Sequence, residues 1–218
     1  MQAQEEQVFS PEIKTIVTRS CVVSAAIAII PGVGVATNAF NQTVMIQQIN
    51  TKLGVSLTKG KVWSVVKRAG MALLATKALS FGASFIPFAG SAVSVTLEAA
   101  STYAVAYVYV DMMKSFAAKG TPAERMTDEA FEKAVDAYMD EHEDMIKEAV
   151  ESGKSFYKKN KDTVSDDEVE RMKALVLAGA KEEEAAVSAE QTERRCANCG
   201  TVLPEGAKFC MECGTKCE

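Results

Sequence analysis

Two short stretches, Ile30-Pro31-Gly32-Val33-Gly34-Val35-Ala36 and Ile86-Pro87-Phe88-Ala89-Gly90-Ser91-Ala92, decide how the first half of this chain folds. Both follow the pattern Ile-Pro-x-x-Gly-x-Ala, and they lie 56 residues apart. Each stretch joins two apolar segments, and proline followed by glycine ends a helix and turns the chain. The repeated pattern therefore predicts two helical hairpins, packed as a pseudo-symmetric four-helix layer.

Start and stop signals place the expected helices around these turns. Ser10-Pro11-Glu12 combines an N-cap, a proline at the first helical position and an acidic first turn, so the first helix is expected from there to about residue 29. Capping boxes at 121–124 and 165–168 open two later helices, and Gly153 is interpreted as the stop of the first of these. The expected helices are 11–29, 35–52, 58–85, 91–119, 121–151 and 165–180. With no alternating strand pattern, the body is predicted to be an all-α helical-hairpin bundle.

Charge is distributed unevenly along the chain. Residues 1–120 carry ten Lys or Arg against five Asp or Glu, whereas residues 121–195 carry twelve against twenty-one. The net charge of −5 argues against nucleic acid as the main partner. The expected organisation is an apolar helical-hairpin domain (1–120), acidic amphipathic helices packing on it (121–180), a charged linker (181–195) and a small cysteine-rich C-terminal segment (196–218).

The C-terminal segment contains two Cys-x-x-Cys pairs, each followed by Gly-Thr, and this pattern predicts a small C-terminal zinc ribbon over 196–218. Two thiolates on one tight turn span one edge of a tetrahedron, and a second turn supplies the opposite edge. The predicted ligands of a structural Zn²⁺ are Cys196, Cys199, Cys210 and Cys213. Because so short a segment cannot bury a useful core, the metal is expected to supply most of its folding free energy, on the order of 10 kcal/mol.

Two disulfides are the alternative to zinc, and they would require an oxidising compartment. The acidic start of the chain, with Glu5 and Glu6, does not match a signal peptide, so zinc and a cytoplasmic location are favoured. Cys217 lies outside the repeat and is expected to be a spectator, with substitution as a ligand left open. Cys21 lies in an apolar run and is expected to be buried.

The segment from Cys196 to Cys213 closely resembles the bacterial four-cysteine zinc-ribbon family, which often forms a terminal tag on unrelated proteins. Ala197 and Met211 stand where that family usually has proline. The resemblance implies zinc binding and recognition of a partner, and it implies no activity.

Turn and packing residues form a second pattern within 22–118: Ile30-Pro31-Gly32, Gln47, Gln48, Leu53-Gly54, Ile86-Pro87, Gly90 and Thr102. In these residues the segment resembles the GTPase-associated helical domain of unknown function, which occurs with bacterial small GTPases and in inner-membrane helical proteins. The chain contains no G-x-x-x-x-G-K-[S/T] motif, so nucleotide hydrolysis is not expected.

Two stretches without charged residues, 20–51 and 78–97, raise the question of a membrane. Pro31 and Pro87 cut each into arms of roughly ten residues, which suits a buried core helix better than a span. A core is favoured, and membrane contact through 20–51 and 78–110 is the alternative. Packing is likewise favoured over an interfacial belt for Tyr103, Tyr107, Tyr109 and Phe116.

The single histidine, His142, falls in a stripe with Phe131, Val135, Tyr138, Met145 and Ala149, which predicts packing. With no catalytic constellation in the sequence, the expected function is a non-enzymatic adaptor or scaffold whose ribbon recruits a protein partner, or which self-associates. The alternative is a membrane-associated accessory of a bacterial GTPase system at the inner face of the membrane.

Overall fold

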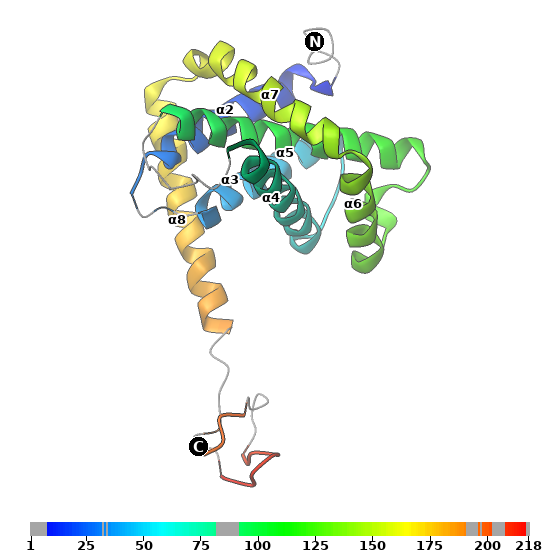
Figure 1. Ribbon diagram of the computed structural model, residues 1–218, viewed down its shortest axis with the longest axis vertical. Coiled ribbons are helices and arrows are strands. Elements are labelled where there is room, and N and C mark those ends of the chain that lie inside the picture. Colours follow the sequence, from blue (N-terminus) through cyan, green and yellow to red (C-terminus); the bar gives the residue numbers. More distant parts are fainter. Residues whose placement is uncertain are drawn as a thin grey trace. The chain divides into compact units, whose positions relative to one another are not determined.

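The described part of the chain is almost entirely helical (Figure 1). The computed structural model describes residues 8–31, 33, 35–81, 92–190, 196, 198–201 and 208–216. The α-helices are α2 (Pro11–Ala28), α3 (Val35–Leu53), α4 (Lys59–Phe81), α5 (Ala92–Ala118), α6 (Asp128–Glu141), α7 (Glu143–Asn160) and α8 (Asp166–Glu190), with short 3₁₀ turns η2 (Ala123–Arg125) and η3 (Lys161–Thr163). The predicted all-α body is confirmed. The chain divides into two compact units, 1–177 and 178–218.

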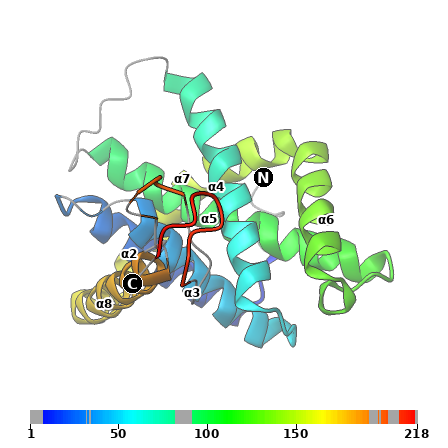
Figure 2. The same cartoon turned by 90° about the horizontal axis from the view of Figure 1, so that it is seen from below.

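Helix α5 is the centre of the first unit. It packs most extensively against α7 and α2. Helix α4 crosses α5 and also packs against α6 (Figure 2). Four consecutive residues of α5, which point in successive directions all round the helix, are each exposed by 1% or less: Tyr103, Ala104, Val105 and Ala106. A helix that is covered on all sides needs no polar face, which explains the continuous apolar sequence of α5.

The helix pairs expected from the repeat are in contact, but α4 crosses α5 and packs more against α6 than against α5. Helix α2 packs against α3, and α4 packs against α5. After α2 the chain turns at once, with the Ile30 N–H donating to the carbonyl of Ile27 at 3.0 Å and the Val33 N–H donating to that of Ile30 at 3.3 Å. The second proline–glycine turn, at 86–90, lies outside the described residues, between the end of α4 and the start of α5.

Most of the described apolar side chains in the stretch 20–51 pack inside the protein, although Ile29 is exposed. Val23, Ile46 and Ile49 are fully buried. The aromatic set on α5 is also packed, since the Tyr103 ring lies 4.7 Å from that of Phe156. Three of the four rings are buried, those of Tyr103, Tyr109 and Phe116, and Tyr107 is partly buried. Over the residues described, no helix has the length and apolar character needed to cross a bilayer.

A buried polar network joins α2, α3 and α5. The Ser24 hydroxyl accepts a hydrogen bond from Asn41 Nδ2 at 2.8 Å and lies 2.7 Å from the hydroxyl of Thr102. It donates to Asn38 Oδ1 at 2.6 Å, and Asn38 Nδ2 donates to Glu98 at 2.7 Å. These amides would be costly in lipid, but here each is satisfied by neighbouring helices, so the network fixes how the three helices meet.

The acidic part of the chain differs from the expectation of one helix over 121–151. The capping box at 121–124 leads only into η2, and the α-helix starts later, where the Thr127 hydroxyl accepts from the Ala130 N–H at 3.2 Å. The helical run then breaks at His142, whose φ of −116° is not helical, and resumes as α7. The helix start predicted at Ser165 is confirmed, because the Glu168 N–H donates to the Ser165 hydroxyl at 3.4 Å.

Gly153 does not stop a helix, contrary to its interpretation as the end of 121–151. It lies inside α7, buried against α5. A Cβ at this position would lie 2.7 Å from the Ala100 carbonyl oxygen and 2.9 Å from its Cα. Glycine is present because the two backbones approach closely, and α7 continues to Asn160.

The charged segment 181–195 begins as helix. Helix α8 continues through it to Glu190, and 191–195 lie outside the described residues. The first part of α8 belongs to the first unit, where Val176 packs in a small cluster with Val23 and Ile27 of α2. Arg19 of α2 pairs with Glu168 at 2.8 Å near the start of α8.

Candidate metal centre

Two matched loops in the second unit carry the four predicted cysteine ligands. In the first, the Gly200 N–H donates to the Cys196 carbonyl at 2.8 Å, and the Cys196 N–H donates to the Thr201 carbonyl at 2.8 Å. In the second, the Gly214 N–H donates to the Cys210 carbonyl at 2.9 Å, and the Cys210 N–H donates to that of Thr215 at 2.8 Å. The same hydrogen bonds in both loops make each Cys-x-x-Cys-Gly-Thr segment a closed knuckle.

Glycine after each second cysteine is required by the backbone. Gly200 has φ of 73° and Gly214 has φ of 71°, in the left-handed region that residues with a Cβ rarely occupy. This conformation lets the chain fold back so that the N–H groups of each loop face its first cysteine. The spacing and the glycines together place two sulfurs on one side of each loop.

The four sulfurs gather at one point. Their Sγ atoms all lie within 4.8 Å of one another, and the pairs Cys196–Cys213 and Cys199–Cys210 are each 3.5 Å apart. Four sulfurs at about 2.3 Å from a common tetrahedral centre lie about 3.8 Å from one another. A disulfide would need about 2.05 Å, and the four are free thiols. The donor set fits a structural Zn²⁺ site, with no position left for water.

Hydrogen bonds to the sulfurs favour their thiolate forms at two of the positions. The Thr215 hydroxyl lies 3.1 Å from Cys213 Sγ and, with the Thr215 backbone N–H, lowers the pKa of that thiol to about 5. Backbone N–H groups of Cys199 and Asn198 lower the pKa of Cys196.

Cys210 behaves differently before a metal enters. Backbone N–H groups of Cys213 and Glu212 act to lower its pKa, but burial and the hydrogen bonds of the neighbouring thiols outweigh them and raise it to about 11. Four adjacent thiolates repel one another, and a divalent cation relieves that repulsion. The chemistry of the cluster is therefore that of a metal-binding site.

Residues 195–216 match the model of the zinc-ribbon domain family. This match covers both knuckles and all four cysteines. The C-terminal segment is a zinc ribbon. A search of curated proteins and a search of solved structures found no match to the chain. None of these findings bears on the resemblance of residues 22–118 to the GTPase-associated helical domain.

The other candidates from the sequence stay apart from this centre. Cys21 is buried in the first unit, and burial raises the pKa of its thiol. His142 caps the break between α6 and α7, where its ring stacks on Tyr138 at 4.1 Å and its Nδ1 lies 2.8 Å from the Tyr138 carbonyl oxygen. This agrees with a packing role for His142. Cys217 lies outside the described residues.

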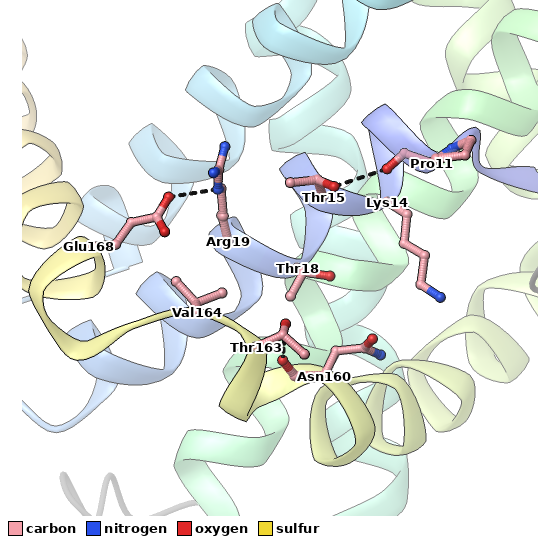
Figure 3. Close-up of a pocket in the computed structure, with 9 residues that line it drawn as sticks. All are labelled: Pro11, Lys14, Thr15, Thr18, Arg19, Asn160, Thr163, Val164 and Glu168. Atoms are coloured by element: carbon pink, nitrogen blue, oxygen red, sulfur yellow. Dashed lines mark hydrogen bonds and ion pairs between the residues drawn. The ribbon is translucent and has the colours of Figure 1, made fainter.

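Two open clefts in the first unit are alternative places for a site. The cleft of Figure 3, about 330 Å³, is lined by Pro11, Lys14, Thr15, Thr18, Arg19, Asn160, Thr163, Val164 and Glu168. Its arginine is turned toward Glu168, to which it is paired, and Thr15 and Thr163 hydrogen-bond to backbone carbonyls. The second, about 440 Å³, lies between the start of α2, Leu53 and Lys114. Among the described residues that line them there is no cysteine or histidine.

The contribution of the two threonines was not predicted from the sequence. Thr201 lies 3.3 Å from Cys199 Sγ, and Thr215 makes the equivalent contact with Cys213. The signal was visible, because Gly-Thr follows both pairs. The sequence does not reveal the role of these threonines, because their hydroxyls reach the sulfurs only after the knuckle has turned the chain back.

Proposed function

We propose that this chain is a non-enzymatic adaptor, in which the zinc ribbon recruits a protein partner and the helical unit forms a scaffold. Zinc in a four-thiolate site is closed to substrate, so the ion serves the fold of the ribbon and supplies no reaction. The proposal includes a cytoplasmic location, where reducing conditions keep the cysteines available to the metal.

The observation that carries the proposal is the exposure of two large apolar side chains beside Cys210. Phe209 is 58% exposed and Met211 is 89% exposed. They stand on a backbone that the knuckle holds in place, so they are presented to solvent without the cost of ordering a loop. Aromatic and methionine side chains of this kind are enriched where proteins bind one another.

The test is affinity capture with the full chain. Phe209→Ser with Met211→Ser removes the apolar contacts and leaves all four cysteines in place. We expect a protein that binds the ribbon to be captured by the unaltered chain, and not by this double variant or by Cys199→Ser. The matched control is Ile29→Ser with Leu175→Ser, which removes two exposed apolar side chains from the first unit. A partner that survives every variant, or that is lost only with the control, contradicts the proposal.

A second candidate is a membrane-associated accessory of a bacterial GTPase system at the inner face of the membrane. Of the residues that carry the resemblance, Thr102 is fully buried, whereas Gln47 and Gln48 are exposed on α3. Core packing explains why Thr102 belongs to the pattern. It does not explain the exposed Gln47 and Gln48, which favours a role in recognition for this pair. Detergent-free fractionation tests this candidate, since recovery of the protein in the soluble fraction counts against it.

A further inference from the structure

The only tryptophan of the chain stands on an exposed ridge of α4. Trp63 is 46% exposed, and so is Met71. Lys59, Trp63, Lys67 and Met71 follow one another at steps of four residues and therefore align along the helix. All four are exposed, whereas another side of α4 carries Val62, Val65, Val66 and Ala69 in the core. This row of four is called the α4 ridge below.

Small neighbours leave the ridge open. A Cβ added at Gly70 would meet no atom within 4 Å, and one at Gly60 would meet only the Thr58 hydroxyl, at 3.9 Å. Both glycines lie next to ridge residues on α4, so neither carries a bulky side chain that could shield the indole. Neither cleft described above is lined by ridge residues. The ridge is therefore a row of exposed side chains that takes no part in either cleft.

The charge of the ridge is positive. Helix α4 contains no Asp or Glu over its whole length. Arg68, on the flank, is neutralised by Asp136 at 2.8 Å and Asp140 at 2.7 Å. Lys59 and Lys67 make no ion pair with the residues that the structure describes. Two ammonium groups thus lie one helical turn to either side of the tryptophan.

We propose that the α4 ridge binds the surface of an anionic lipid bilayer. A tryptophan ring is stable at headgroup depth, and lysines beside it keep their charge among lipid phosphates while their stems cover apolar surface. An exposed row that lines neither cleft offers charge and a ring but no pocket for a side chain of a partner, which suits a bilayer better than a folded acidic protein.

The ridge lies outside the stretches 20–51 and 78–110 considered from the sequence. The proposal depends neither on the ribbon nor on a GTPase. Because the row is short, the contact is weak and reversible, and salt screens it.

The tryptophan provides its own readout, because no other residue contributes indole emission. The full chain is mixed with vesicles of phosphatidylcholine alone, or of equal parts phosphatidylcholine and phosphatidylglycerol. We expect the emission to shift to shorter wavelength with the anionic vesicles only, and brominated lipids to quench it. Absence of a shift with anionic vesicles overturns the proposal, and so does vesicle binding that leaves the emission unchanged.

Matched charge reversals separate the ridge from general attraction. Lys59→Glu with Lys67→Glu abolishes the shift. Lys158→Glu with Lys159→Glu makes the same change of charge at exposed positions on α7 and preserves it. Equal loss in both double variants overturns the proposal, since net charge would then explain binding. A shift produced by polyglutamate but not by anionic vesicles also overturns it and assigns the ridge to an acidic protein.

Discussion

At the scale of single residues, Gly153 is where one methyl group matters most. An alanine Cβ there would lie 2.7 Å from the backbone oxygen of Ala100, and backbone atoms cannot move aside as a flexible side chain can. Alanine favours helices by about 1 kcal/mol over glycine, but forcing α5 and α7 apart costs more. We expect Gly153→Ala to lower the free energy of unfolding by about 2 kcal/mol, measured by urea denaturation.

Gly70 is the matched control for that substitution. It also lies inside a helix, but open space surrounds it. Gly70→Ala is expected to raise the free energy of unfolding by about 0.5–1 kcal/mol, because only the helix preference changes. The same sign for both substitutions would contradict the close approach of α5 and α7.

Thr215 is expected to control how the ribbon responds to acid. The Thr215 hydroxyl and N–H lower the pKa of Cys213 to about 5, from the ordinary thiol value of 9.0. Cys213 is therefore a thiolate, the form that binds zinc, above about pH 5, and it becomes protonated as the pH falls through that value. Without the hydroxyl, protons compete more strongly with zinc. Thr215→Val should therefore move the midpoint of zinc release to higher pH, followed with a chromogenic zinc indicator.

Thr201→Val provides the comparison for Thr215→Val. The contact of Thr201 with Cys199 is longer, 3.3 Å against 3.1 Å, so its shift should be smaller. Identical release curves for Thr215→Val and the unaltered protein would show that the hydroxyl does not act on the sulfur.

At the scale of helices and turns, capping residues correctly predicted the start of a helix where the capping hydrogen bond forms within the same short segment. The Ser10 hydroxyl accepts from the Ile13 N–H at 3.3 Å, so the first helix begins where its N-cap predicts. The segment 121–126 contains equally good signals but forms only a 3₁₀ turn. The carbonyl of Ala123 in this segment accepts a hydrogen bond from a lysine 62 residues earlier in the chain. The sequence near position 121 gives no sign of so distant a partner.

That lysine, Lys61, is a buried anchor between α4 and η2. Its ammonium donates to the Ala123 carbonyl at 3.2 Å and to the Met126 carbonyl at 2.6 Å, and it is 6% exposed. Methionine keeps the length of the side chain and loses the donors, leaving two carbonyls without them. We expect Lys61→Met to lower the free energy of unfolding by about 1–3 kcal/mol and to speed hydrogen exchange around 123–128.

Lys67→Met serves as the control on the same helix. This side chain is exposed, so its loss should change stability by less than about 0.5 kcal/mol. If Lys61→Met and Lys67→Met lowered the free energy of unfolding equally, the hydrogen bonds of Lys61 would contribute nothing beyond its charge.

The metal centre was more predictable than the fold of the acidic part, for a physical reason. Cys-x-x-Cys-Gly sets the bite of two sulfurs and the turn behind them within five residues. The place of Gly153 depends instead on the close approach of α7 to α5, a helix far away in the sequence. The exposure of Trp63 belongs to the same class, because only the packed structure reveals which side of α4 is covered.

At the scale of the whole molecule, the chain consists of two compact units with different sources of stability. The first buries a large apolar core, whereas the second includes a ribbon organised by four thiols. Removal of zinc by a chelator should therefore erase the amide protection of 196–216 and leave the thermal transition of the helical unit in place. A common shift of both would show that the units fold as one.

The most direct test of the account is zinc-edge X-ray absorption on the full chain, purified under reducing conditions without chelator. We expect one zinc per chain with four sulfur ligands at about 2.3 Å. Cys199→Ser should lose the ion or exchange one sulfur for oxygen. Nitrogen or oxygen ligands in the unaltered protein, or cysteines that bind no metal, would contradict the four-thiolate centre and with it the proposed adaptor.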